Sequence, residues 1–306
     1  MSKPLLVAGS INMDLVMRTP RVPHSGETLF GEELRAISGG KGANQAVAVA
    51  RLGTPVFLAG RVGRDHFGQI MLSGLSASGV DCSKVELDDE ASSGTAFIFV
   101  EPSGENTIVV ATGANGRFTI RSAERLAGLL ERVELVLLQL ELPLEATARV
   151  IELARTAGKR IVLDAGPVCR HPLPEFFQVD VLSPNEAEAE ALSGLPIRDP
   201  DSALRAARAL LERGPGAVVL KLGAAGALLA SRAKTLFLPP HPVQAVDTTA
   251  AGDAFSAALA VSLAEGKALE EAVRVANAAG ALATTRAGAQ PSMPTRTELE
   301  AFLGRA

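Results

Sequence analysis

The chain has 306 residues, with 30 Lys and Arg against 34 Asp and Glu, which gives a formal net charge of -4. A general nucleic-acid binder would carry a basic stripe, and a membrane span would need about 18 consecutive apolar residues. The sequence has neither feature. Cys82 and Cys169 fit neither a disulfide framework nor a zinc site, and the first apolar run is too short for a signal peptide. We therefore expect a cytoplasmic protein without a nucleic-acid or membrane partner.

Short apolar runs alternate with helix-like segments along most of the chain. Runs that are apolar on both faces, as in a parallel sheet covered on both sides, lie at 5–8, 56–59, 133–138, 160–163, 179–182 and 217–220. Helix-like segments separate them at 44–52, 67–78, 122–131, 144–157, 186–192 and 203–213, and three more follow a last strand at 236–238, at 253–264, 269–285 and 297–303. The alternation predicts a single three-layer α/β/α domain over 1–306 with a central, mostly parallel sheet.

Two segments interrupt this pattern. Residues 14–38 contain two prolines and two glycines between patches of alternation, and 95–101 with 106–112 read as a hairpin around a Pro-Ser-Gly-Glu turn. These insertions, approximately 14–38 and 95–112, predict a small β-sheet that lies over the main domain as a lid. Plain surface hairpins are the alternative. A lid hinged at Gly39 and Gly40 would close over a ligand and expel water.

Ligands of open parallel sheets bind beyond the carboxyl ends of the strands. The P-loop, dinucleotide and protein-kinase signatures are missing, and the four histidines show no metal-ligand spacing. The most informative stretch is 247–255, Asp-Thr-Thr-Ala-Ala-Gly-Asp-Ala-Phe, which runs directly into a predicted helix. We expect the amides from Ala250 to Asp253 to be unpaired first-turn donors near the positive end of a helix dipole.

Small side chains at 250–252 would let an anion approach these amides closely. Asp253 then stands where the anion would sit, which is the wrong charge for phosphate binding alone. The conflict disappears if Asp253 faces an incoming hydroxyl while the amides hold the transferred group. The alternative is that Asp253 is only an N-terminal cap.

A second stretch, 38–46, has three glycines within 39–42 and can bring main chain up to a ligand. Lys41 could meet a phosphate, and Asn44 could hydrogen-bond a sugar hydroxyl or cap the following helix. A flexible turn is the alternative. Asn12 and Asp14 follow the first strand, where paired short polar side chains suit a polyhydroxylated ligand or an Asx-turn.

Three weaker signals also follow strands. Asn185 opens a helix that it could cap, and Glu188 could reach a metal or its waters. The glycines within 221–226 suit a nucleotide lying flat against the chain. Glu141 ends another strand with a carboxylate. An exposed surface carboxylate is the alternative for Glu141 and for Glu188.

Together these residues resemble the ribokinase (PfkB) family of carbohydrate kinases over essentially the whole chain. The first family signature is present as Gly39, Gly40, Gly42, Asn44, Ala46, Gly53 and Gly63, and the second as 247–258 with its Ala-Ala-Gly-Asp core. The strings at 9–14, 39–46 and 288–292 are also typical of the family. Two long signatures about 200 residues apart are more specific than a lone glycine motif.

The resemblance implies a ribokinase-like fold, ATP and Mg²⁺ as cofactors, and activation by a monovalent cation such as K⁺. It implies that Asp253 takes the proton of the sugar's primary hydroxyl and that Ala250, Ala251 and Gly252 form an anion hole. The implied sugar site consists of Asn12, Asp14, Gly40, Lys41, Gly42, Ala43, Asn44, Glu141 and Asp253. The implied ATP site consists of Asn185, Lys221, Leu222, Gly223, Ala224, Ala225, Gly226, Gly252 and Asn277. Glu188 would support Mg²⁺ through water, and the cation site would consist of Asp247, Thr249, Ala283, Arg286, Gly288 and Ser292.

The activity implied is transfer of phosphate from ATP to the 5-hydroxyl of D-ribose. Deoxyribose, a ketohexose, a sugar acid or a nucleoside are alternative substrates, and a non-catalytic sugar or nucleotide sensor is the alternative from another class. The resemblance also implies a homodimer formed through the exposed edge of the lid sheet. The sequence departs from the family at 164–167, Asp-Ala-Gly-Pro in place of Asn-Pro-Ala-Pro, and at Thr249, where an apolar residue is common.

Overall fold

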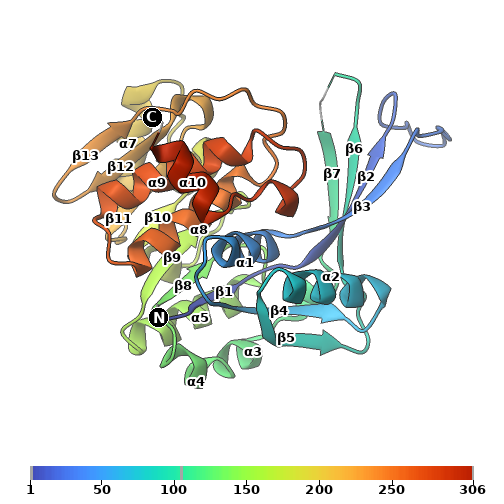
Figure 1. The fold of residues 1–306 in the computed structure, drawn as a ribbon, viewed down its shortest axis with the longest axis horizontal. Helices are drawn as coiled ribbons and strands as arrows, with labels where there is room; N and C mark the ends of the chain where they lie inside the picture. Colours follow the sequence, from blue (N-terminus) through green and yellow to red (C-terminus); the bar gives the residue numbers. More distant parts are fainter. Residues whose placement is uncertain (1–2, 104–105, 305–306) are drawn as a thin grey trace.

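The computed structural model describes residues 3–103 and 106–304. Within them, the larger sheet has nine strands in the order β13-β12-β11-β10-β9-β8-β1-β4-β5 (Figure 1). The strands are β1 (Leu5–Ala8), β4 (Val56–Gly63), β5 (Asp81–Asp88), β8 (Leu135–Leu138), β9 (Arg160–Asp164), β10 (Val181–Ser183), β11 (Ala217–Lys221), β12 (Ala227–Ser231) and β13 (Thr235–Leu238). Neighbours from β5 to β11 are parallel, whereas β12 and β13 pair antiparallel at one end.

Helices cover both faces of this sheet. One face carries α1 (Lys41–Arg51), α2 (His66–Ala77), α8 (Ala251–Ala264), α9 (Leu269–Ala283) and α10 (Arg296–Leu303). The other carries α3 (Ile120–Glu124), α4 (Ala127–Leu130), α5 (Leu144–Thr156), α6 (Glu186–Ser193) and α7 (Pro200–Glu212). No helix in the described part of the chain is long and apolar enough to cross a bilayer.

The central strand β1 explains the two-sided core. Leu5 and Val7 belong to one buried apolar cluster, whereas Leu6 and Ala8 belong to the other. This alternation arises because successive residues of a strand point to opposite faces of the sheet. The three-layer architecture predicted from runs that are apolar on both faces is therefore confirmed.

The individual predictions of strands and helices differ from the structure at three places. The sequence pattern misses β5, a partly exposed edge strand rich in polar residues, and β12, which follows a glycine-rich turn after β11. The helix expected at 122–131 is divided into α3 and α4. Of these elements, β12 begins beside the carboxyl end of β11, where Ala227 pairs with Lys221.

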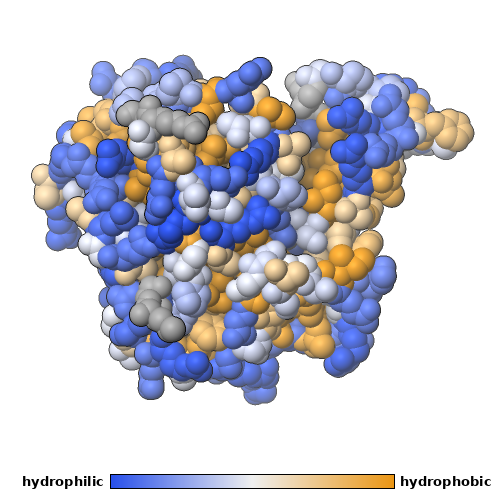
Figure 2. All heavy atoms as spheres, in the orientation of Figure 1, coloured by the Kyte–Doolittle hydropathy of each residue, from blue (hydrophilic) through white to orange (hydrophobic). Residues whose placement is uncertain are grey.

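The two interrupting segments form a separate sheet of four strands in the order β3-β2-β6-β7. Its strands are β2 (Asn12–Arg18), β3 (Leu34–Gly39), β6 (Gly94–Val100) and β7 (Asn106–Ala111). The sheet projects from the body of the molecule (Figures 1 and 2). The predicted hairpin corresponds to β6 and β7, and the first strand begins at Asn12, two residues before the predicted insertion.

Asn115 forms hydrogen bonds to the segment that connects β1 of the large sheet to β2 of the small sheet. This residue lies in the short helix η1 (Gly113–Arg117) and is buried. Its Oδ1 accepts a hydrogen bond from the amide of Ile11 (3.0 Å), and its Nδ2 donates to the Ile11 carbonyl (3.0 Å) and to Asn12 Oδ1 (2.8 Å). Asn115 therefore orients Asn12, although no motif or spacing in the sequence pointed to Asn115.

We expect Asn115→Ala to lower the free energy of unfolding by about 2–4 kcal/mol, because it leaves a buried amide and a buried carbonyl of Ile11 without partners, at about 1–3 kcal/mol each. Denaturant unfolding measures the change. Asn106→Ala, on the exposed strand β7, is the control and should change stability by no more than about 0.5 kcal/mol. Equal effects of the two substitutions would contradict this account.

Candidate active site

The site is built where strand ends of the large sheet meet helix starts. Strand β9 ends at Asp164, β11 ends at Lys221, and α1 and α8 begin at Lys41 and Ala251. A cavity of about 860 Å³ opens there and is lined by Lys41, Asn185, Glu188, Lys221, Gly252, Asp253 and Asn277, among others. Its volume lies in the range of small-molecule binding sites, about 300–1,000 Å³.

The start of α8 has an unusual backbone. Ala250, the N-cap residue, has φ 58° and ψ 13°, a left-handed conformation that costs a non-glycine residue about 1–2 kcal/mol. The amide of Ala251 donates to the Thr248 carbonyl at 3.2 Å, so the prediction that all four amides are unpaired is wrong for Ala251. No described residue accepts a hydrogen bond from the amides of Ala250, Gly252 and Asp253, and the last two belong to the first turn of α8. These two amides remain available to an anion.

Asp253 does not cap α8, because its side chain lies against α1 instead. Its Oδ2 accepts from Asn44 Nδ2 at 3.0 Å and its Oδ1 from Gln45 Nε2 at 3.1 Å. The residue is only 4% exposed. Burial raises the pKa of Asp253 to about 6, although the positive charge of Lys41 opposes the rise. The arrangement fits a proton acceptor and excludes the capping alternative.

The glycine-rich stretch brings the first helix against this carboxylate. Gly40 is the N-cap residue of α1 and has φ 89°, so α1 begins three residues before Asn44 and the alternative that Asn44 caps this helix is wrong. A β-carbon on Gly39 would lie 2.1 Å from Asp14 Oδ2. Asn44 Oδ1 is buried and has no partner among the described residues, which leaves one unsatisfied acceptor on the residue that donates to Asp253.

The other predicted sugar residues lie around the junction of the two sheets. Burial, followed by the charges of Glu141 and Asp253, raises the pKa of Asp14 to about 7. The carboxylate of Glu141 accepts hydrogen bonds from Ser10 Oγ and from the amide of Lys41. Glu141 therefore anchors the start of α1 in this structure. Asn12 is tied to Asn115 as described above.

Two predicted sugar residues contribute little side-chain surface. Ala43 packs in the apolar core, and its amide donates to the Ser10 carbonyl. A β-carbon on Gly42 would lie 2.6 Å from Gly9 Cα, so this glycine is required by close packing of two backbones. Of the predicted sugar set, Lys41 and Asp253 line the large cavity.

Most of the predicted nucleotide residues line that cavity: Asn185, Lys221, Gly223, Ala224, Gly226, Gly252 and Asn277. Leu222 instead packs in the apolar core, and Ala225 is exposed without lining the cavity. Asn277 Nδ2 donates to the Pro239 carbonyl at 2.7 Å. The predicted nucleotide residues therefore lie mainly around one cavity, and only Leu222 and Ala225 are outside its lining.

The residues near Glu188 fit Mg²⁺ bound through water. Glu188 and Asn185 form a reciprocal capping box at the start of α6, with 2.8 Å bonds in both directions. This box uses Glu188 Oε2 and leaves Oε1 on the side of Gly166. No group of three His, Cys, Asp or Glu residues in 3–103 and 106–304 could hold a metal by itself, so the ion would be held mainly by a bound nucleotide.

The predicted monovalent-cation residues lie on two loops that Asp247 joins. Its Oδ1 accepts from the Thr249 amide at 2.9 Å and its Oδ2 from the Gly288 amide at 2.8 Å. The Arg286 guanidinium pairs with Glu298. Because the side chains of Asp247 and Arg286 already have partners, a cation here would rely mainly on backbone carbonyls, a type of ligand that binds K⁺. Of the remaining predicted ligands, Ala283 ends α9 and Ser292 ends the short helix η4 (Gln290–Ser292).

Two polar residues that the sequence analysis did not assign complete the site. Asp164 is fully buried, and its Oδ1 contacts Lys221 Nζ at 2.6 Å. Gln45 is also fully buried and donates to Asp164 Oδ2 at 2.9 Å as well as to Asp253. The departure from the family pattern at Asp164 was a usable signal, whereas nothing in the sequence distinguished Gln45 from an ordinary helix residue.

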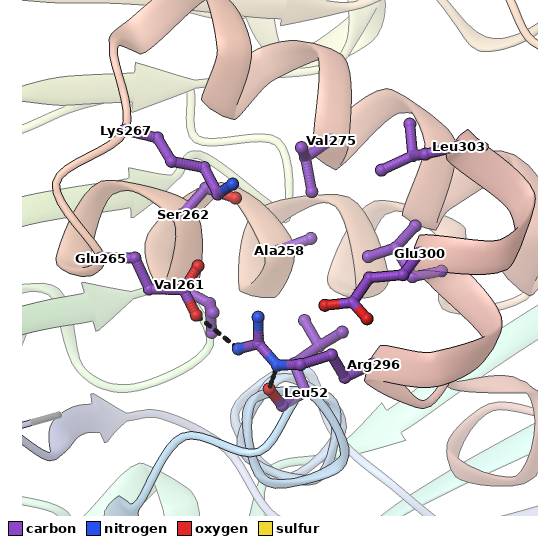
Figure 3. Close-up of a pocket in the computed structure, with 11 residues that line it drawn as sticks. Leu52, Ala258, Val261, Ser262, Glu265, Lys267, Val275, Arg296, Glu300 and Leu303 are labelled. Carbon is purple, nitrogen blue, oxygen red and sulfur yellow. Dashed lines mark hydrogen bonds and ion pairs between the residues drawn. The ribbon is translucent and has the colours of Figure 1, made fainter. Parts of the chain in front are cut away.

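A second cavity, of about 60 Å³, lies among α8, α9, α10 and the end of α1 (Figure 3). Arg296 crosses it, pairs with Glu265 and donates to the Leu52 carbonyl. The space admits a few water molecules at most. It is therefore a packing feature of the helical layer and has no room for a sugar or a nucleotide.

Comparison with known proteins identifies the family. The model of the "pfkB family carbohydrate kinase" matches residues 2–296. Ribokinases of Haemophilus influenzae and Bacillus subtilis are 38% and 40% identical over 306 and 299 residues, covering 100% and 98% of this chain and 100% and 99% of theirs. A Salmonella typhi protein named deoxyribokinase is 34% identical over 300 residues, covering 98% of each chain.

Solved structures agree with this match. The structure of Arabidopsis thaliana ribokinase complexed with ribose and ATP aligns with a TM-score of 0.92 at 34% identity, covering 99% of each chain. The architecture of a large, mostly parallel sheet with a separate small sheet is thus shared. This chain belongs to the pfkB family of carbohydrate kinases.

Proposed function

We propose that this protein transfers the γ-phosphoryl group of ATP to the primary 5-hydroxyl of D-ribose, giving ribose 5-phosphate and ADP. One observation carries the proposal: the buried Asp253 carboxylate and the free amides of Gly252 and Asp253 share the first turn of α8, at the wall of a cavity of about 860 Å³. The names of the full-length relatives support ribose as the acceptor.

In this mechanism the protein aligns the reactants and neutralises charge, which is most of what phosphoryl transfer requires. Asp253 accepts the proton of the attacking hydroxyl, and the amides of Gly252 and Asp253 hydrogen-bond the transferring group. Lys41 lines the same cavity, and its pKa lies above the usual range because four surrounding carboxylates outweigh its burial. It therefore stays charged and can balance phosphate oxygens.

We include Mg²⁺ and a monovalent cation in the proposal. Glu188 Oε1 would hold water of a nucleotide-bound Mg²⁺, whose charge neutralises phosphate oxygens. The loops joined by Asp247 would hold K⁺ through carbonyls and so brace the backbone just before Ala250.

We further propose that the small sheet closes over the sugar, with Gly39 and Gly40 at the hinge. We also propose that the protein works in the cytoplasm, which supplies ATP and would keep the unpaired Cys82 and Cys169 reduced.

Ribose is favoured over 2-deoxyribose because Asn12 and Asp14 offer polar groups to vicinal hydroxyls. A site built to hydrogen-bond a hydroxyl rejects the analogue that lacks it. The similarity to a deoxyribokinase makes 2-deoxyribose the competing substrate. An ADP-release assay over ribose, 2-deoxyribose, ketohexoses, sugar acids and nucleosides, with and without K⁺, should give the highest kcat/KM on ribose. Equal kcat/KM on ribose and 2-deoxyribose would contradict the assignment.

We expect Asp253→Asn to lower kcat by about 10²–10⁴-fold, the usual contribution of a general base. Asparagine has the same shape as aspartate, so the affinity for a non-hydrolysable ATP analogue should stay within about threefold. Steady-state kinetics and calorimetric titration measure the two quantities. Near-normal kcat would exclude Asp253 as the proton acceptor.

The activity should fall on the acid side as Asp253 takes up a proton. Because its pKa is about 6, kcat/KM should be constant above this value and decrease about tenfold per pH unit below it. Asp14→Asn is the companion variant, since Asp14 titrates near pH 7 in the same region. If kcat/KM of Asp14→Asn still decreases below about pH 6, the decrease is assigned to Asp253. A kcat/KM that is unchanged down to pH 4.5 would contradict that assignment.

We also propose a homodimer that covers the small sheet. Leu34, Phe97 and Val109 are 58%, 45% and 58% exposed and lie on the face opposite Asp14, because β2–β3, β2–β6 and β6–β7 pair residues of one face directly. Figure 2 shows hydrophobic side chains where this sheet leaves the body. An apolar face and an open strand edge favour pairing with a second copy.

Phe97→Asp should convert the dimer to a monomer, because it places a charge in the buried apolar contact. Size-exclusion chromatography with light scattering measures the mass. Ile120→Asp, a charge introduced at an exposed isoleucine on α3, should leave the dimer intact. A wild-type protein that elutes at monomer mass would remove this proposal.

A further inference from the structure

Asp164 and Lys221 form a buried ion pair at the end of the cavity. Their strands, β9 and β11, flank β10 in the large sheet, so the two residues occupy equivalent ends of next-nearest strands. Asp164 is fully buried, the Lys221 side chain is 12% exposed, and Lys221 Nζ lies 2.6 Å from Asp164 Oδ1. Neither the proton transfer nor the amide contacts described above uses this pair.

Asp164 is ionised and fully hydrogen-bonded. Besides Lys221, it accepts from Gln45 Nε2 at 2.9 Å and from Ser256 Oγ at 3.0 Å. Burial alone would raise the pKa of Asp164, but the charges of Lys221 and Lys41 and the hydrogen bonds from Lys221 and Ser256 hold it below its usual value. A charged carboxylate with this many fixed donors is a rigid anchor.

The anchor places the Lys221 ammonium beside the free amides of α8. A β-carbon on Gly252 would lie 3.8 Å from Lys221 Nζ, and both residues line the large cavity. A cation next to amides that have no acceptor is the arrangement that binds an anionic oxygen strongly. This end of the cavity therefore offers a third positive group to a phosphate, in addition to the amides and Lys41.

The same carboxylate is joined to Asp253 by one side chain. Gln45 Nε2 donates to Asp164 Oδ2 and, at 3.1 Å, to Asp253 Oδ1, while Gln45 Oε1 accepts from Gln139 Nε2. Ionised carboxylates only accept hydrogen bonds, so both hydrogens of the Gln45 amide are committed. The positions of Asp164 and Asp253 are thus coupled through a single buried amide.

Stability does not by itself explain such a pair. Replacing a buried ion pair by apolar residues of similar size is often neutral or stabilising, whereas removing one partner is costly. We propose that Lys221 is a further catalytic residue, which contacts the terminal phosphates of the bound nucleotide, and that Asp164 is a positioning residue, which fixes Lys221 directly and Asp253 through Gln45. This inference rests on the proposed phosphotransfer function.

The first test compares nucleotides that differ in their terminal phosphates. Lys221→Met should weaken binding of a non-hydrolysable ATP analogue by about 10–100-fold, the loss of one hydrogen bond to a charged group. Binding of AMP should change by less than about threefold. Lys234→Met removes an exposed lysine that pairs with Glu270 and is the matched control, with no change for either ligand. An equal effect of Lys221→Met on AMP and on the ATP analogue would overturn the role of Lys221.

The second test separates positioning from stability. Asp164→Asn should lower kcat and move the acid limb of kcat/KM to lower pH, because it removes a negative charge that raises the pKa of Asp253. Asp164→Asn combined with Lys221→Met should recover thermal stability relative to each single variant, since neither charge is then left unpaired, but kcat should stay low. Recovery of kcat together with stability, or an unmoved acid limb, would reduce the pair to a structural role.

The two tests also distinguish this inference from the proposed function. A wild-type protein that releases no ADP with any sugar would refute the proposed function, while the comparison of AMP with the ATP analogue would still decide whether Lys221 binds terminal phosphates. An active wild type with unchanged Lys221 and Asp164 variants would refute the inference alone.

Discussion

A carboxylate that is removed from water must obtain its hydrogen bonds from the protein. Asp253 is 4% exposed, and each of its carboxylate oxygens accepts a hydrogen bond from a side-chain amide of α1, that of Asn44 or that of Gln45. Burial makes this carboxyl group more basic than a surface aspartate, with a pKa of about 6. The candidate active site therefore depends on two helices from opposite halves of the chain that meet at one charged group.

The large sheet and the small side chains of the helices make this meeting possible. Helices α1 and α8 pack on the same face of the sheet, and both contribute many alanines to the shared apolar core. Short side chains let the helices approach closely enough for Asn44 and Gln45 to reach Asp253. Ala250, with its left-handed backbone, directly precedes α8, and the carboxylate of Asp253 and the unpaired amides of Gly252 and Asp253 share the first turn of this helix at the wall of the cavity.

The sequence predicted those parts of the molecule that depend on local patterns. Runs that are apolar on both faces predicted the three layers, and the two signatures predicted a candidate site at the starts of α1 and α8, which contact each other through Asn44 and Asp253. It did not predict the link from Lys221 through Asp164 and Gln45 to Asp253, because these contacts join residues 57 to 208 positions apart. The hydrogen bond from the Ala251 amide to the Thr248 carbonyl was not predicted either, because it depends on a turn that bends the backbone back on itself.

A crystal structure of the protein with D-ribose and a non-hydrolysable ATP analogue would test the central claim most directly. The account predicts that the ribose 5-hydroxyl lies within hydrogen-bond distance of the Asp253 carboxylate, while γ-phosphate oxygens accept from the amides of Gly252 and Asp253. A γ-phosphate bound away from the start of α8, or a sugar whose primary hydroxyl points away from Asp253, would contradict it.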